Sequence, residues 1–168
     1  MQHVIIGAGP AGVVAAEAIR DLDESSTVTL LGDEPERPYS RMAIPYYLVG
    51  QIAEEGTHLR KDEGHFASLG IDVRLNRARQ IETDANIVVL EGGERLQYDR
   101  LLIATGSSPV KLPIPGIDLP GVLNCWTLED ARRIVAVCQP GRRVVRGRPD
   151  VGDPPPAEVA QIKEPLLS

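Results

Sequence analysis

The stretch Val4-Ile5-Ile6-Gly7-Ala8-Gly9-Pro10-Ala11-Gly12 decides the fold of this chain. Three apolar residues, typical of a strand buried on both faces, lead directly into a Gly-x-Gly-x-x-Gly turn. In such a turn the first glycine allows a sharp exit from the strand. The second lets a pyrophosphate approach the backbone, and the third lets the next helix pack on the strand. The first amides of that helix favour phosphate. The stretch therefore predicts a dinucleotide site made by Gly7, Gly9, Pro10, Ala11 and Gly12.

The composition of the 168 residues is that of a globular protein, with 42% hydrophobic and 25% charged residues. The net charge of -6 disfavours nucleic acid and anionic membrane surfaces as partners. No apolar run is long enough to cross a bilayer, and no basic leader of a signal peptide precedes the first strand. Cys125 and Cys138 are too few for a disulfide framework. We expect a cytoplasmic protein without nucleic-acid or membrane partners.

The hydrophobic pattern predicts an α/β fold, with a parallel sheet, flanking helices and a small antiparallel meander. Parallel strands are expected over residues 4–6, 28–31, 71–75 and 101–104, and the meander over 78–82, 86–90 and 95–98. Helices are expected over 11–22, 43–50, 62–69 and 128–137. The first helix would turn Glu17 and Arg20 outward, Asp62 would cap the third, and Thr127 the last.

The end of the chain differs in character from the rest. Residues 142–145 resemble the start of one more strand, but residues 146–168 are rich in proline and lack apolar periodicity. We therefore expect a domain over residues 1–145, followed by a disordered or loosely attached tail over 146–168.

Two acidic residues, Asp33 and Glu34, follow the glycine turn by about twenty residues, at the end of the second predicted strand. A carboxylate at this place accepts hydrogen bonds from ribose hydroxyls and repels a 2′-phosphate. The pair therefore favours FAD or NAD, and the spacing leaves open which of the two carboxylates binds the ribose.

Two further candidates for the site are Arg41 and the segment Ala104-Thr105-Gly106. The guanidinium of Arg41 could donate two hydrogen bonds to a pyrophosphate. Thr105 and Gly106 end a predicted strand, and in a doubly wound sheet the carboxyl ends of the strands face the ligand. A hydroxyl and a residue without a side chain suit close contact with a cofactor.

Three motifs occur in a fixed order: residues 4–12, residues 32–41 with Gly-Asp-Glu-Pro and Pro-Tyr-Ser-Arg, and residues 98–106 with Tyr-Asp-Arg-Leu-Leu-Ile-Ala-Thr-Gly. With them, residues 1 to about 145 resemble the N-terminal part of the FAD-dependent pyridine nucleotide-disulfide oxidoreductases. The branch of that family with rubredoxin reductases, ferredoxin reductases and the nitrite reductase large subunit is the most similar.

The resemblance implies a Rossmann-like FAD-binding domain. It places the FAD pyrophosphate at Gly9 to Gly12 and the adenosine ribose at Asp33 or Glu34. It also implies that Ala78 contacts the adenine through its backbone. The remaining residues implied to contact the cofactor are Arg41, Thr105 and Gly106.

The sequence departs from the family pattern at several places. Family members carry a second glycine fingerprint for NAD(P)H and a late Gly-Asp motif, and neither occurs here. We therefore expect an incomplete FAD-binding domain, truncated or diverging near Val145, with NAD(P)H as donor only in a full-length parent. Met42 stands where coenzyme A disulfide reductases carry a cysteine. The sequence offers no candidate catalytic residue, and His3, His58 and His65 lack the spacing of metal ligands.

These features leave three hypotheses about function. The first is the FAD-binding portion of an NAD(P)H-dependent flavoprotein oxidoreductase that passes electrons to an acceptor such as a small redox protein. Whether this chain turns over alone is open. The second is a non-catalytic FAD or NAD(H) module or relic. The third, an NAD dehydrogenase, is disfavoured by the Thr105-Gly106 segment and by the loop Tyr39-Ser40-Arg41.

Overall fold

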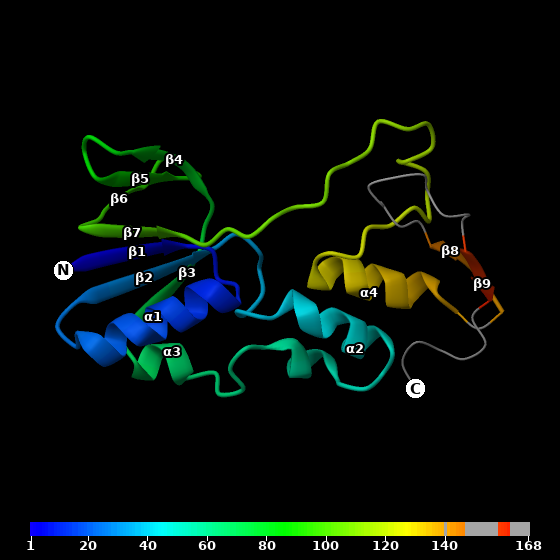
Figure 1. The fold of residues 1–168 in the computed structure, drawn as a ribbon, viewed down its shortest axis with the longest axis horizontal. Helices are drawn as coiled ribbons and strands as arrows, with labels where there is room; N and C mark the ends of the chain where they lie inside the picture. Colours follow the sequence, from blue (N-terminus) through cyan, green and yellow to red (C-terminus); the bar gives the residue numbers. More distant parts are fainter. Residues whose placement is uncertain (140, 147–157, 162–168) are drawn as a thin grey trace. The chain divides into compact units, whose positions relative to one another are not determined.

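The computed structural model describes residues 1–139, 141–146 and 158–161. The chain divides into two compact units (Figure 1). The first unit consists of Met1–Arg41 and Glu54–Ser107, and the second of Met42–Ala53 and Ser108–Ser168. The three sequence motifs all lie in the first unit.

A four-stranded parallel sheet with the order β3-β2-β1-β7 forms the centre of the first unit. Its strands are β1 Gln2–Ile6, β2 Thr27–Gly32, β3 Ile71–Leu75 and β7 Arg100–Ile103. The helices are α1 Pro10–Leu22 and α3 His65–Ser68, with the short 3₁₀ helix η2 Glu54–Thr57. The strand β1 lies between β2 and β7, as its run of apolar residues predicts.

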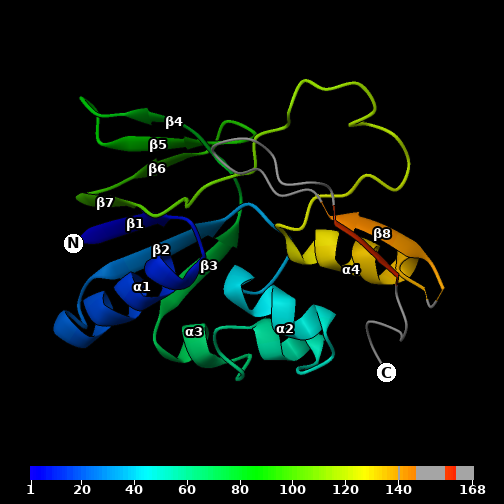
Figure 2. The ribbon, with the colours of Figure 1, turned by 45° about the vertical axis from the view of Figure 1, so that its right-hand side comes forward.

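The two faces of this sheet are covered by different layers (Figures 1 and 2). An antiparallel sheet of β4 Ala78–Glu82, β5 Ile87–Leu90 and β6 Arg95–Gln97 covers one face, and α1 and α3 cover the other. Successive side chains of a strand point to opposite faces. Val4 and Ile6 therefore pack with Val88 of the meander, whereas Ile5 packs with Val13 of α1. The predicted α/β architecture with its meander is confirmed.

The second unit holds α2 Ile44–Leu48, preceded by the 3₁₀ helix η1 Arg41–Ala43, and α4 Leu128–Val137. The predicted cap of α4 is present, because the Thr127 hydroxyl accepts a hydrogen bond from the Asp130 amide at 3.1 Å. The strands β8 Arg143–Arg146 and β9 Glu158–Gln161 pair antiparallel. Most of the predicted tail, residues 147–157 and 162–168, lies outside the described residues.

Several local predictions in the first unit are wrong. The helix expected over residues 62–69 is confined to His65–Ser68. The Asp62 carboxylate accepts from the Gly64 amide at 2.9 Å, which closes a turn before the helix instead of capping it. Arg20 does not face solvent, because it donates to the carbonyl oxygens of Leu69 at 2.7 Å and Ser26 at 2.6 Å.

Glu17, also expected to face solvent, instead links α1 to the segment before α3. Its Oε1 lies 2.7 Å from Nε of Arg60 and 2.7 Å from Nε2 of His65, and its side chain is only 17% exposed. The hydrogen bond from Arg60 outweighs the effect of burial and, with His65, lowers the pKa of Glu17 below its usual value of 4.5.

This lowered pKa makes the stability of the first unit depend on pH. Because the folded-state pKa lies below the unfolded-state pKa, ionised Glu17 stabilises the fold fully above the unfolded value, and the contribution is lost as the pH falls through the folded value. We expect the free energy of unfolding of the wild type to exceed that of Glu17→Gln by about 1 kcal/mol at neutral pH. Urea unfolding should show this difference shrinking below about pH 4.5. The exposed Glu55→Gln is the matched control, and a difference that persists to low pH would contradict the assignment.

Candidate dinucleotide-binding site

The glycine turn after β1 is fixed by its neighbours on both sides. Gly7 has a φ of 117°, a conformation that L side chains rarely adopt. Its amide donates to the Leu31 carbonyl oxygen at 2.8 Å, at the end of β2. A β-carbon on Gly7 would overlap the carbonyl oxygen of Ala104, just after β7. The turn therefore lies against the carboxyl ends of both neighbouring strands.

The space around Gly9 is open, whereas Gly12 is closely packed. A β-carbon on Gly9 would find no described atom within 4 Å, so this side of the turn is open. One on Gly12 would overlap the carbonyl oxygen of Gly7 and lie 3.3 Å from Cγ2 of Ile5. Gly12 is thus needed for the packing of α1 on β1, whereas Gly9 leaves room for a group to approach.

The beginning of α1 has the features of an anion site. Gly9 is its N-cap residue and Pro10 its first residue, and no side chain of the described residues caps it. The first turn, which includes Ala11, holds no acidic residue. The amides at the start of this 13-residue helix can therefore donate to a phosphate, with the positive end of the helix dipole behind them.

The side chains of the acidic pair at the end of β2, Asp33 and Glu34, contact different residues. Asp33 has a side chain 54% exposed, and its Oδ2 lies 3.9 Å from Nε of Arg77. Glu34 turns to the loop that follows: its Oε2 accepts from the Tyr39 hydroxyl at 2.6 Å, and its Oε1 pairs with Nη2 of Arg41. The two carboxylates that the spacing could not distinguish therefore have different partners.

Arg41 lies close to the end of β7. A β-carbon on Gly106, which has a φ of 66°, would be 3.9 Å from Nη1 of Arg41. Burial acts against the charged form of Arg41, but the carboxylate of Glu34 raises its pKa above the usual value. Arg41 therefore presents a permanent positive charge beside the Thr105-Gly106 segment.

Ala78 begins β4 and pairs with Leu90. The preceding stretch approaches the end of β2, because the Asn76 amide donates to the Gly32 carbonyl oxygen at 2.8 Å. Through Arg77, this stretch reaches Asp33. The predicted site residues thus gather at the carboxyl ends of β1, β2 and β7. Ala78 lies at the start of β4, in the antiparallel sheet.

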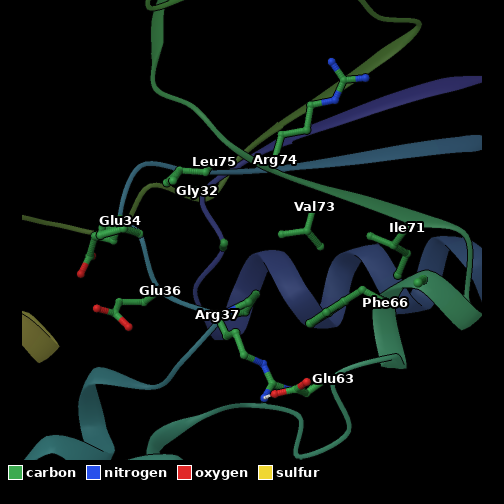
Figure 3. A pocket seen from close by; sticks show the side chains of 14 residues that line it. Gly32, Glu34, Glu36, Arg37, Glu63, Phe66, Ile71, Val73, Arg74 and Leu75 are labelled. Carbon is green, nitrogen blue, oxygen red and sulfur yellow. Dashed lines mark hydrogen bonds and ion pairs between the residues drawn. The ribbon is translucent and has the colours of Figure 1, made fainter.

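A cavity of about 410 Å³ opens beside the glycine turn (Figure 3). It lies between β3, α3 and the loop of residues 34–38, and Ala8, Gly32 and Glu34 are among its lining residues. Its apolar lining includes Phe66 from α3 and Ile71, Val73 and Leu75 from β3. Arg37, at one side, lies 3.4 Å from Glu63.

Sequence reasoning did not identify Arg37, Phe66 or Arg77 as neighbours of the site. Arg37 stands in a charged, proline-rich loop, and Phe66 has the place of an ordinary core residue. Arg77 follows Asp33 by 44 residues in the sequence, and only the pairing of β2 with β3 brings the two together. No local pattern could have signalled these neighbours.

Other chemistry finds little support in the part of the chain that the structure describes. It contains no cluster of His, Cys, Asp and Glu suited to a metal ion, and no helix long and apolar enough to cross a bilayer. Desolvation, with the nearby Asp130 carboxylate, raises the pKa of the Cys125 thiol. This is the opposite of what a reactive thiolate needs.

The fold and the glycine turn define a Rossmann-like dinucleotide-binding domain. The family described as pyridine nucleotide-disulphide oxidoreductase matches residues 1–148. The chain belongs to this family. Members of this family bind FAD and use NAD(P)H, and FAD is the cofactor that the sequence predicts.

Two curated relatives illustrate the match. The chain is 36% identical over 142 residues to a probable ferredoxin reductase, CtmF, of Castellaniella defragrans, covering 84% of this chain and 35% of the relative. It is 37% identical over 143 residues to the ferredoxin–NAD(+) reductase component of the biphenyl dioxygenase system of Paraburkholderia xenovorans, again covering 84% and 35%. The chain therefore spans about a third of the length of these relatives.

Solved structures agree with this assignment. Putidaredoxin reductase in its covalent complex with putidaredoxin matches with a TM-score of 0.71 at 31% identity, over 79% of this chain and 33% of the other. An NAD-dependent persulfide reductase of A. fulgidus matches with a TM-score of 0.74 at 34% identity, over 81% and 27%.

Proposed function

We propose that this chain is the FAD-binding portion of an NAD(P)H-dependent flavoprotein oxidoreductase that passes electrons to a separate acceptor. The observation that carries the proposal is the beginning of α1. Its first amides have no side-chain cap, and the space beside its N-cap residue Gly9 is open. Such a helix terminus binds a pyrophosphate. The carboxylate of Asp33 and the guanidinium of Arg41 lie on the segments that follow β2.

The site residues divide the binding of FAD among them. The amides of Gly9, Ala11 and Gly12 hold the pyrophosphate, since Pro10 has no N–H, and a carboxylate after β2 accepts from the adenosine ribose. Arg41 donates to the cofactor. The remaining proposed contacts are made by the backbone of Ala78 and by Thr105 and Gly106. Bound FAD supplies the redox chemistry, and the residues of this chain bind and orient it.

The acceptor that we propose is a small redox protein. The names of the relatives support this choice, because they include ferredoxin reductases, a rubredoxin-NAD(+) reductase of Pseudomonas putida and the putidaredoxin reductase. NAD(P)H is proposed as the donor on the same basis.

An FAD titration of the purified chain tests the cofactor assignment directly. We expect flavin absorbance to stay with the protein after desalting, and ADP to displace the flavin. Riboflavin lacks the pyrophosphate and the adenosine, so it should bind at least about tenfold more weakly. Equal affinity for riboflavin and FAD would contradict a site built on the α1 terminus. Binding of NADH but not of FAD would favour an NAD(H) module.

A further inference from the structure

The place of Glu34 after β2 suggests that it binds the ribose, but its carboxylate contacts Tyr39 and Arg41. We propose that Glu34 is a positioning residue that holds the guanidinium of Arg41 for the cofactor, and that Asp33 alone accepts from the ribose. This inference rests on the proposed function, because it divides the labour within the same FAD site.

Both carboxylate oxygens of Glu34 already accept hydrogen bonds. The Tyr39 hydroxyl donates to Oε2 at 2.6 Å, and Arg41 donates to Oε1. The Glu34 side chain is 25% exposed. To accept from a ribose, it would have to give up or share a charge-assisted hydrogen bond with Arg41, which is among the stronger hydrogen bonds in proteins.

Asp33 has the opposite surroundings. Its side chain is 54% exposed, and the contact that the structure gives it is the ion pair with Arg77 at 3.9 Å. An ionised carboxylate has about four acceptor positions on its two oxygens. Asp33 can therefore accept from two ribose hydroxyls and keep its pairing with Arg77.

The loop that carries Tyr39, the partner of Glu34, is held by backbone hydrogen bonds. The amide of Ser40 donates to the Thr57 carbonyl oxygen at 2.9 Å, and the amide of Leu59 donates to the Pro38 carbonyl oxygen at 2.9 Å. Tyr39 is buried, with 7% of its surface exposed. Its hydroxyl therefore fixes Glu34 from a rigid place, and Glu34 in turn restricts the long side chain of Arg41. Ordering such a side chain in advance removes an entropic loss from cofactor binding.

A double-mutant cycle on FAD affinity tests the proposal. Arg41→Ala is expected to raise the Kd for FAD by about 10- to 100-fold, and Glu34→Gln by about tenfold. If Glu34 acts through Arg41, Glu34→Gln should change the Kd by less than about twofold when Arg41 is already alanine. Asp33→Asn should instead weaken FAD binding by the same factor in both backgrounds.

Two controls keep the result interpretable. Glu24→Gln removes one negative charge from an exposed side chain after the end of α1 and should leave the Kd unchanged. Thermal unfolding of each variant shows whether it folds. If Glu34→Gln does not fold, Glu34→Asp takes its place in the cycle, since it keeps the charge but shortens the reach to Arg41.

The outcomes separate the inference from the function on which it rests. Equal effects of Glu34→Gln with and without Arg41 would mean that Glu34 contacts FAD directly, and would overturn the positioning role alone. No effect of Glu34→Gln in the wild-type background would overturn it too. A wild-type chain that binds no FAD would overturn the proposed function and this inference with it.

Discussion

Gly12→Ala is expected to destabilise the first unit by about 3 kcal/mol, the upper part of the range for overpacking a closely packed interior. The added β-carbon would overlap the carbonyl oxygen of Gly7 and press on Cγ2 of Ile5 at 3.3 Å. The first of these neighbours is backbone, fixed by the hydrogen bond of Gly7 to Leu31 at 2.8 Å. The obstacle therefore cannot move aside as the end of a flexible side chain could.

The helix α1 would have to move away from β1 to accommodate this atom. Val13 and Ala16, both fully buried against the sheet, would lose part of their packing. Because the amides at the start of α1 would move with the helix, FAD affinity should fall as well. A single substitution thus links the core to the candidate site.

Urea unfolding followed by circular dichroism measures the loss of stability. Gly9→Ala is the matched control, since it adds the same atom three residues earlier, where no described atom lies within 4 Å. Unfolding midpoints for Gly12→Ala and wild type that coincide would show that the turn can relax, and that close packing of α1 on β1 does not require glycine.

The sequence was sufficient to predict those parts of the fold that depend on local pattern. The strand β1 has Ile5 on one face and Val4 and Ile6 on the other, and a run that is apolar throughout can only be buried on both faces. The glycine spacing likewise predicts the turn, because a β-carbon at Gly7 or Gly12 would collide with backbone. The glycine spacing carries these requirements as a local pattern, although the backbone that a β-carbon on Gly7 would meet belongs to Ala104.

The parts that could not be predicted depend on residues distant in the sequence. Glu17 has the position of an outward side chain on α1, but Arg60 and His65 follow it by 43 and 48 residues and meet it in space. The separation of Asp33 from Glu34 has the same origin. It depends on the loop that brings Tyr39 back to Glu34, and two adjacent acidic residues give no signal of it.

Gly9→Ala is expected to separate binding from stability: we predict about a 100-fold higher Kd for FAD, which corresponds to about 2.7 kcal/mol. The reason is the open side of the glycine turn, where an added β-carbon meets no described atom within 4 Å. In the proposed function this space belongs to the pyrophosphate, which needs close contact with the amides at the start of α1. A methyl group there would hold the phosphates away from those amides.

The fold itself should tolerate this change. Gly9 has a φ of -79° and a ψ of -176°, which alanine adopts without strain. Alanine is a weaker N-cap residue than glycine, so we expect a loss of stability below about 1 kcal/mol. FAD titration and urea unfolding of the same preparation measure both quantities. Unchanged FAD affinity in a folded Gly9→Ala variant would place the pyrophosphate elsewhere, and the α1 terminus would then lose its part in the proposed function.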